Sequence, residues 1–316
     1  RTDGTLSGTA SSLISTFANT TYTYSGDVTV TGNVNAAQLK AINAATSGEI
    51  TLNVTNDSLF GTASDLAAAF AGTVTTHTGT VIITDEPTVG QLKTINDATS
   101  GAITLADTNG TLSGSASDLV DAFDGTITGY EGNITVTGAA SLSQLDAIDS
   151  ATTGTITVAD ITDANATLTT NTNDWLATAT GTVTINNVAT LAEIDTINAH
   201  VDNGTTVATA ITDANATLTT NTNDWLATAT GTVTINNVAT LAEIDTINAH
   251  VDNGTTVATA ITDATATLAT NTNDWLATAT GTITTNTAAT LGQLDTINGH
   301  IDAGTFAAPV DITDAT

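Results

Sequence analysis

The sequence predicts an α/β repeat protein, a β/α solenoid built from short strands and short helices. Residues 161–210 recur without a change as residues 211–260, and a looser third copy begins at Ile261. Within each copy, runs of Thr and β-branched residues alternate with helical patterns, which indicates that strand and helix take turns along the chain. We therefore expect about 25 residues per coil and two coils in each unit of about 50 residues.

The unit boundaries follow from one Leu that marks each of six units. These markers are Leu6, Leu59, Leu112, Leu168, Leu218 and Leu268. Residues 1–157 then form three repeats of about 53 residues, and residues 158–316 form three repeats of about 50 residues plus the start of a further repeat. Because the last residues repeat the opening of the unit at Ile161, we expect the chain to be a segment of a longer array.

Two helices are expected in each unit. The first is represented by residues 62–70, where Thr62 is a candidate N-cap and the acidic Asp65 follows three residues later. The second places apolar residues on one face, and Gly204 is its expected stop. In the fourth unit this face consists of Leu191, Ile194, Ile197 and Val201.

The strands are expected where β-branched apolar residues alternate with Thr, because such runs bury one face and leave the other in water. Examples are the runs 28–30, 134–136 and 183–185. Asn109-Gly110 is a typical hairpin turn between two such runs. An alternative fold for the N-terminal half is therefore a set of β-hairpins alternating with helices.

The two halves differ in the expected core. Aligned on the marker Leu, the pair Leu13 and Phe17 corresponds to Trp175 and Ala179. The first position changes from Leu to the larger Trp, and the second changes from Phe to the smaller Ala, which roughly conserves the volume of a packed site. We expect a Leu/Phe core in the first half and a Trp/Ala core in the second, with a partner for each indole N–H. A ladder of sugar-stacking Trp residues is the alternative.

Composition excludes several classes of function. The chain has three basic residues, thirty-two acidic residues and a net charge of −29, so we expect no nucleic-acid partner and no binding to anionic membranes. No apolar run is long enough to insert into a membrane, and there is no Cys. The residues His200, His250 and His300 recur with the repeat, which is typical of a helix-end position rather than of a catalytic group. We expect that the protein is not an enzyme.

No metal site or cofactor is expected. Asp163 lies near Asn165, and Asn171 lies near Asn173 and Asp174, so these clusters offer oxygen ligands to Ca²⁺. They lack the glycine and the terminal Glu of a Ca²⁺-binding loop, and N-capping explains them equally well. Loosely bound Ca²⁺ stays open as an alternative.

Covalent glycans are a further expectation, because the chain contains many Asn-x-Ser/Thr sequons. The candidate sites are Asn19, Asn53, Asn56, Asn109, Asn133, Asn165, Asn203, Asn215 and Asn253. Rows of outward Thr, such as Thr182 and Thr184, resemble the threonine ladders of ice-binding solenoids. The preference of Thr for the wet face of a strand also explains them.

The near-identical tandem units, the acidic balance, the richness in Thr, Ala, Asn and Asp and the absence of Cys resemble the repeat regions of giant secreted bacterial adhesins and extracellular filament proteins. This resemblance implies a structural protein at the cell surface or outside the cell, which acts as a rod, stalk or filament, carries glycans and self-associates. The alternative is a carbohydrate-binding or ice-binding solenoid adhesin.

Overall fold

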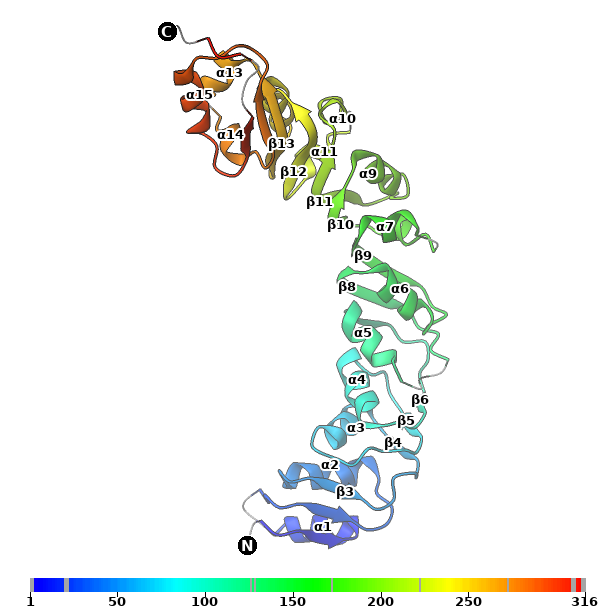
Figure 1. Cartoon of the computed structure of the whole chain (residues 1–316). Coiled ribbons are helices and arrows are strands. Elements are labelled where there is room, and N and C mark those ends of the chain that lie inside the picture. Colours follow the sequence, from blue (N-terminus) through cyan, green and yellow to red (C-terminus); the bar gives the residue numbers. More distant parts are fainter. Residues whose placement is uncertain are drawn as a thin grey trace. The chain divides into compact units, whose positions relative to one another are not determined.

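The chain divides into two compact units, residues 1–159 and residues 160–316, which we call the N-terminal and the C-terminal unit. Figure 1 shows short strands alternating with short helices in both units, so the predicted α/β repeat is confirmed. The structure, a computed structural model, describes residues 3–19, 23–125, 127, 129–171, 173–221, 223–271, 273–307 and 311–313.

In the N-terminal unit, a helix follows each strand except β3 and β6. The strands are β1 (Leu6–Gly8), β2 (Val28–Val30), β3 (Ile50–Leu52), β4 (Leu59–Gly61), β5 (Val81–Ile83), β6 (Ile103–Leu105), β7 (Leu112–Ser115) and β8 (Ile134–Ala140). The helices are α1 (Ala10–Phe17), α2 (Ala36–Ala45), α3 (Ala63–Phe70), α4 (Val89–Ala98), α5 (Ala116–Phe123) and α6 (Leu142–Asp149).

In the C-terminal unit, pairs of short helices alternate with single longer helices. Strand β9 (Ile156–Asp163) contains the boundary between the units. The further strands are β10 (Thr182–Ala189), β11 (Thr205–Asp213), β12 (Thr232–Ala239), β13 (Thr255–Asp263), β14 (Thr282–Thr285) and β15 (Thr305–Ala307). The helices are α7 (Asn165–Thr169), α8 (Trp175–Thr178), α9 (Leu191–Asn198), α10 (Asn215–Thr219), α11 (Trp225–Thr228), α12 (Leu241–Asn248), α13 (Thr265–Ala269), α14 (Trp275–Thr278) and α15 (Leu291–Asn298).

Strand pairing in the described part of the N-terminal unit is parallel. Strands β1, β2 and β3 form one sheet, β4, β5 and β6 form a second, and β7 pairs with β8. Paired residues lie 22 positions apart, as Leu6 with Val28 and Val28 with Ile50. Parallel neighbours need a crossover connection, which the helices supply. The alternative of antiparallel hairpins in this half is therefore wrong.

The Asn109-Gly110 turn lies between β6 and β7, which pair with β5 and β8 and not with each other. The backbone N–H of Asn109 donates to Asp107 Oδ1, and the backbone N–H of Thr111 donates to Glu86 Oε1. Side-chain carboxylates thus accept hydrogen bonds from backbone N–H groups that would otherwise be available to a hairpin. This is why a typical hairpin signal here gives an open connection.

In the C-terminal unit, consecutive strands from β10 to β15 pair in chain order, and all these pairs are parallel. The offset alternates between 22 positions, as in Ile211 with Val233, and 23 positions, as in Val183 with Thr206. We call one strand, with the helical segments that follow it, a layer. The chain therefore advances by one layer at each strand pairing.

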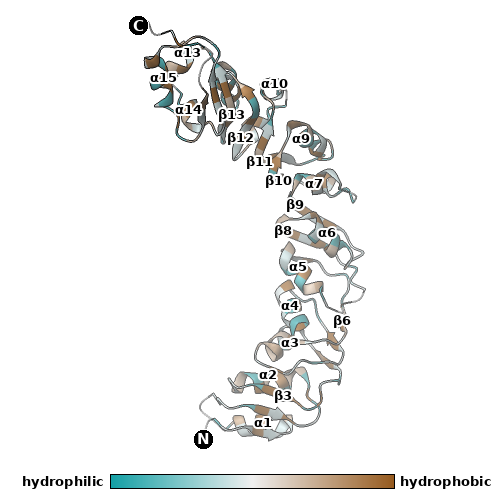
Figure 2. Cartoon of the chain, viewed as in Figure 1, coloured by the Kyte–Doolittle hydropathy of each residue, from teal (hydrophilic) through white to brown (hydrophobic). Residues whose placement is uncertain are grey.

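The core follows the predicted alternation. Val28 and Val30 are fully buried on either side of the half-buried Thr29, and Leu39 and Ile42 of α2 are fully buried as well. Figure 2 shows hydrophobic residues along the strands and helices of both units. Each large apolar side chain buried in this way contributes about 1.5–3 kcal/mol. The predicted strands with one buried face and the predicted amphipathic helices are confirmed.

The predicted helix starts are confirmed, whereas one predicted end is wrong. The side chain of Thr62, the N-cap of α3, accepts a hydrogen bond from the backbone N–H of Asp65. Helix α9 begins at Leu191 but ends at Asn198, so Val201 lies beyond it and Gly204 is not its stop. A tighter turn ends the helix earlier, because the N–H of the residue after its C-cap bonds to a carbonyl only three residues back.

The alignment of the two halves on the marker Leu is wrong by seven positions. Leu6 lies in strand β1, whereas Leu168 lies in helix α7. The strand register provides the correct correspondence, because Leu6 and Ile161 each pair with a residue 22 positions later. Ile161 thus corresponds to Leu6, and Leu168 corresponds to Leu13. A buried Leu occurs in both a strand and a helix, so the apolar pattern alone could not separate the two registers.

This correction changes the expected core exchange. Ala179, which is fully buried, corresponds to Tyr24 rather than to Phe17. In the N-terminal unit the rings of Phe17 and Tyr24 pack with their centroids 6.0 Å apart. In the C-terminal unit Trp175, which is 7% exposed, is the large residue of this region. The exchange of large for small residues holds, but between other positions than the sequence suggested.

Candidate functional site

The contacts between successive layers are the candidate functional site, because they repeat with the chain. On the longer helix of alternate layers, one charged residue follows the central Leu or Ile. We call this residue the clasp position. It is Lys40 in α2, Lys93 in α4, Asp146 in α6, Asp195 in α9, Asp245 in α12 and Asp295 in α15.

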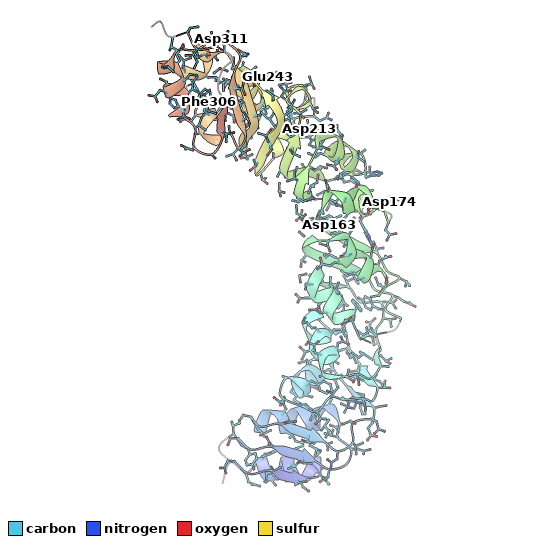
Figure 3. The ribbon with its side chains drawn as sticks, viewed as in Figure 1. Asp163, Asp174, Asp213, Glu243, Phe306 and Asp311 are labelled. Carbon is cyan, nitrogen blue, oxygen red and sulfur yellow. The ribbon has the colours of Figure 1, made fainter. Side chains whose placement is uncertain are left out.

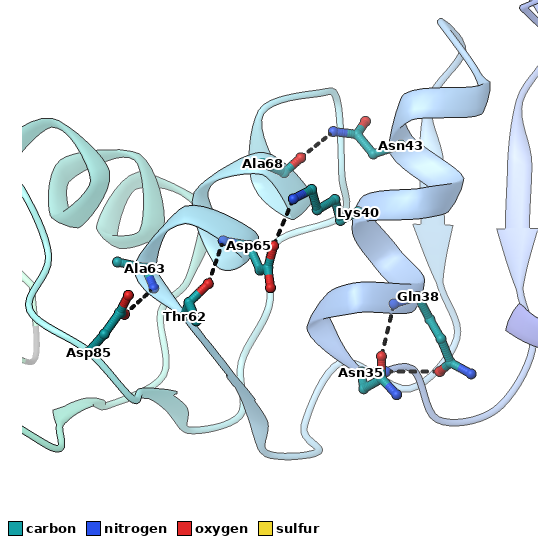
Figure 4. A network of polar contacts seen from close by, with 9 residues as sticks. All are labelled: Asn35, Gln38, Lys40, Asn43, Thr62, Ala63, Asp65, Ala68 and Asp85. Atoms are coloured by element: carbon teal, nitrogen blue, oxygen red, sulfur yellow. Dashed lines mark hydrogen bonds and ion pairs between the residues drawn. The ribbon is translucent and has the colours of Figure 1, made fainter.

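In the N-terminal unit the clasp lysines of α2 and α4 each form an ion pair with the next helix, whereas the clasp position of α6 is the acid Asp146. Lys40 Nζ lies 2.7 Å from Asp65 Oδ1 of α3, and Figure 4 shows this contact beside the bond from Asn43 Nδ2 to the carbonyl oxygen of Ala68. Hydrogen bonding to Lys40 lowers the pKa of Asp65. Both charged side chains are partly exposed, so the pair fixes the register of the helices more than it stabilises them.

The next pair of layers in this unit repeats the arrangement. Lys93 forms an ion pair with Asp121 of α5, and this hydrogen bond raises the pKa of Lys93. Asn96 Nδ2 donates to the carbonyl oxygen of Asp121 at 3.2 Å. Lys40 and Lys93 lie 53 positions apart on equivalent helices, and that spacing was the signal in the sequence that could have identified the clasp.

In the C-terminal unit the clasp position is an acid, and the next layer supplies neutral donors. Asp195 Oδ1 accepts hydrogen bonds from Trp225 Nε1 and from Asn223 Nδ2, both at 2.7 Å. Asp245 accepts the same two bonds from the following copy of the unit, also at 2.7 Å. Hydrogen bonds to a charged acceptor are stronger than neutral ones. The indole N–H therefore has the partner that its burial requires.

The Trp side chains are enclosed rather than displayed. Trp175 and Trp225 are 7% and 9% exposed, and Trp275 is half-buried. A sugar-stacking site needs an open ring face, which Trp175 and Trp225 do not offer. These burials favour packing over the carbohydrate ladder.

The N-termini of the longer helices carry capping boxes of two kinds. In α2, α4 and α6 the capping box uses Gln38, Gln91 and Gln144. In α9 and α12 it uses Glu193 and Glu243, and in α15 of the same unit it uses Gln293. The backbone N–H of the N-cap Thr, hydrogen-bonded to the carboxylate, lowers the pKa of each Glu.

The two clusters of candidate Ca²⁺ ligands differ in their contacts. Asp163 Oδ1 accepts from the N–H of Ala164, and Asp213, labelled in Figure 3, accepts from the N–H of Ala214 and from the N–H of Leu191. No group of three or more His, Cys, Asp or Glu side chains in the described residues could hold a metal ion. The contacts of Asp163 and Asp213 favour backbone capping. In the second cluster, the side-chain amide of Asn171 is buried without a hydrogen-bond partner among the described residues, and Asp174, the N-cap of α8, makes no side-chain capping bond.

The sequons fall into two groups. The exposed ones are Asn19, Asn53, Asn56, Asn109, Asn133, Asn203 and Asn253. Asn165 and Asn215 are half-buried, and their Nδ2 atoms donate to the carbonyl oxygens of Val188 and Val238, each at 3.2 Å. A glycan on Nδ2 would disturb these bonds, so the structure disfavours glycosylation at both.

The histidines occupy two kinds of position. His200 and His250 are exposed just after a helix end, and His300 is half-buried there. His77, in contrast, is 1% exposed, and neither ring nitrogen has a hydrogen-bond partner among the described residues. It occupies the position of Tyr24 and Tyr130 in the neighbouring repeats. Burial lowers the pKa of His77, and the nearby Asp57 opposes this only in part.

The Thr rows are partly covered. Thr162 pairs with Thr184 and Thr212 pairs with Thr234 on neighbouring parallel strands, and all four are half-buried. The hydroxyl of Thr209, also half-buried, donates to the carbonyl oxygen of Ile185 at 2.9 Å. These hydroxyls thus belong in part to the sheet, which is the alternative to an ice-binding face.

Among the described residues, no helix has the length and apolar character needed to cross a bilayer. Comparison of the chain with protein-family models, with curated proteins and with solved structures found no match.

Proposed function

We propose that the protein is a structural repeat protein outside the cell or at its surface, where it forms a rod, stalk or filament and is not an enzyme. Its fold is a β/α solenoid with about 25 residues per coil and two coils per unit of about 50 residues. The function of such a protein depends on its length. Glycans on exposed Asn residues and self-association into filaments belong to the same proposal.

One observation carries this proposal: the same contact between layers recurs with each copy of the unit. Trp225 bonds to Asp195, and fifty positions later Trp275 bonds to Asp245 with the same atoms at the same distance. A residue that recurs because its unit recurs serves stacking more simply than it serves a single reaction centre. Each added unit can therefore lengthen the object without new chemistry.

The net charge of −29 supports the same interpretation. It keeps an extended surface soluble and repels anionic polymers. With so many like charges, the attraction that holds the layers together must be local. Buried Leu and Ile side chains and the clasp contacts provide that attraction.

The experiment is a change in the number of units. Deletion of residues 211–260, which removes one identical copy, should leave a folded chain whose longest dimension in X-ray scattering is shorter by about 10 Å. This value is twice the strand spacing of about 4.8 Å, because one unit adds two strands. Insertion of an additional copy should lengthen the chain by the same step.

The matched control deletes only residues 211–235. It joins layers of unlike type, separates Asp195 from a Trp-bearing layer and should destabilise the C-terminal unit. Equal tolerance of both deletions, or a dimension that does not change with unit number, would contradict a rod built by stacking.

A further inference from the structure

An exposed aromatic ring on strand β4 interrupts the repeat in the middle of the N-terminal unit. Phe60 is 61% exposed. At the equivalent strand position of the other repeats the residue carries a small hydroxyl group: it is Ser7, Ser113, Thr162, Thr212 or Thr262. A residue that recurs with the repeat serves stacking. An exposed departure from the repeat therefore points to a function other than stacking.

The strand beside β4 changes in the same sense. Phe60 pairs with Ile82 of β5, whereas the equivalent Ser113 pairs with Thr135. Ile82 is half-buried, and its neighbours on both sides point into the core. The outer face of this sheet is therefore apolar at two adjacent positions where the equivalent strand pair is polar.

A groove of about 420 Å³ adjoins Phe60. Its lining includes Asn33, Asn35, Gln38, Asp57, Ser58 and Phe60. These residues come from the start of α2 and the turn before it, and from β4 and the turn before it. We call this site the Phe60 groove. Its volume lies within the range of about 300–1,000 Å³ that is usual for small-molecule sites.

The following repeat shows why this groove is open. There Glu86 replaces Asn33, and its Oε1 accepts a hydrogen bond from the backbone N–H of Thr111 at 2.9 Å. Thr111 is the equivalent of Ser58, so this bond spans the corresponding space. The side chain of Asn33 is shorter and uncharged, and it leaves that space to the groove.

The lining offers amide donors of a defined kind. In the capping box of α2, Asn35 Oδ1 accepts from the backbone N–H of Gln38, and Gln38 Oε1 accepts from the backbone N–H of Asn35 (Figure 4). The capping box thus occupies both amide oxygens and uses neither NH₂ group. Helices α4 and α6 have Thr88 and Ser141 as N-cap residues, which supply no second amide.

Asp57 adds a carboxylate to the lining. Its Oδ2 is buried and has no hydrogen-bond donor among the described residues, so the carboxylate keeps capacity to accept a hydrogen bond. A hydroxyl group can accept from an amide NH₂ group and donate to a carboxylate, whereas a metal cation cannot accept and a deprotonated anion cannot donate. The net charge of −29 also disfavours acidic polymers.

The ring of Phe60 completes the set, because an exposed aromatic face can pack against the C–H face of a sugar ring. We propose that the Phe60 groove binds a neutral sugar residue of an oligosaccharide or polysaccharide. Phe60 packs against the ring, the amides of Asn35 and Gln38 donate to its hydroxyl groups, and Asp57 accepts from one of them. This binding goes beyond the proposed structural role and does not depend on it.

The test adds neutral hexasaccharides of glucose and of mannose to the 316-residue chain, produced without glycans. NMR saturation transfer from the aromatic protons to the sugar detects contact with a ring. We expect transfer to the C–H protons of at least one hexasaccharide, with a Kd of about 1 mM, as befits a small contact. No transfer to either sugar would overturn the proposal.

Phe60→Ser tests the ring, and it installs the residue of the neighbouring repeats, so the variant should fold. It should weaken binding by about fivefold or more. Val188→Ser is the matched control, since Val188 is 52% exposed on β10 of the other unit, and it should bind like the parent chain. Equal Kd values for Phe60→Ser and the parent chain would refute the role of Phe60.

Two further variants test the polar lining. Asn33→Glu recreates Glu86, should close the groove and should weaken binding by about tenfold or more. Asn35→Thr keeps the N-cap as Thr88 does, removes one NH₂ donor and should weaken binding by about threefold. Thr88→Asn is its control, because it adds the same amide beside Glu86 and should leave the Kd unchanged. If Asn33→Glu and Asn35→Thr both bind like the parent chain, the sugar occupies another site and the proposal is wrong.

The source and the charge of the sugar are tested separately. Tighter binding of polygalacturonate, an acidic polymer, than of the neutral hexasaccharides would refute the neutral class. If the glycan-bearing chain self-associates and Phe60→Ser abolishes this association, the sugar belongs to a second copy of the chain. If only added hexasaccharides bind, it belongs to a foreign polysaccharide.

Discussion

The clasp residues of α2 and α4 in the N-terminal unit and those of α9 and α12 in the C-terminal unit connect successive helices with opposite charges at the same position. In the N-terminal unit, Lys40 of α2 and Lys93 of α4 form ion pairs with Asp65 and Asp121, whereas the third clasp position is Asp146 of α6. The C-terminal unit contains no Lys or Arg, places Asp195 and Asp245 at the clasp, and answers them with indole and carboxamide donors. A region without cations can still hold a carboxylate between layers if neutral N–H groups surround it. The layered fold therefore tolerates a complete change of clasp chemistry.

The two units also place their aromatic residues at different positions. In the N-terminal unit, ring pairs such as Phe70 with His77, 6.2 Å apart, pack at the turn after the short helix. In the C-terminal unit Trp225 combines the bulk and the hydrogen-bond donor in one side chain. All three Trp residues lie in the C-terminal unit, so Trp fluorescence reports on that unit alone.

The largest expected effect comes from removing that Trp. Trp225→Ala should destabilise the C-terminal unit by about 3–5 kcal/mol, because it leaves a cavity and deprives Asp195 of a donor. Urea unfolding followed by the fluorescence of the two remaining Trp residues measures this loss. Hydrogen exchange of the strands in the N-terminal unit should not change.

Trp225→Phe provides the control, since it keeps a six-membered aromatic ring and removes the N–H with the rest of the indole. It should cost about 1.5–3 kcal/mol, the range for a hydrogen bond to a charged group. An equal loss for Ala and Phe would mean that packing contributes little. A parallel loss in the N-terminal unit would mean that the two units unfold together.

The sequence predicted the alternation of strands and helices because apolar periodicity is local and is repeated many times. It did not predict the register between the halves, since Leu168 in a helix and Leu6 in a strand are both apolar residues at the start of a repeated pattern. It also missed the clasp. The bond from Trp225 to Asp195 spans 30 positions, and no local pattern links an acid on one helix to an indole in the next layer.

The middle repeat of the N-terminal unit has the buried His77 at the position where the neighbouring repeats have Tyr24 and Tyr130. His77 has a lowered folded-state pKa, so the unfolded chain takes up a proton first as the pH falls below about 6.5. Stability of the N-terminal unit is therefore complete above this pH and declines below it, until the folded state also binds the proton. His77→Tyr should abolish this decline. It should also add about 1 kcal/mol at pH 7.5, if the new hydroxyl donates to a carbonyl oxygen as Tyr130 does to Gly110.

Hydrogen exchange of β5 between pH 5 and pH 7.5, corrected for intrinsic rates, checks the His77 variant. His250→Tyr is the control, because His250 is exposed at a helix end in the other unit. If the decline below pH 6.5 persists in His77→Tyr, another group causes it.

The smallest expected effect concerns the choice of Glu or Gln in the capping boxes. Glu193 and Glu243 have lowered folded-state pKa values, so their contribution is complete above the unfolded value near 4.5 and is lost as the pH falls through the folded value. The double variant Glu193→Gln and Glu243→Gln should have nearly the same free energy of unfolding as the parent chain at pH 7. Between pH 5 and pH 3 its urea midpoint, followed by Trp fluorescence, should fall less steeply than that of the parent. The reciprocal variant Gln91→Glu should introduce an acid-sensitive cap into the N-terminal unit. If both variants keep the slopes of the parent chain, the acid sensitivity of the units comes from other carboxylates and the capping boxes are interchangeable.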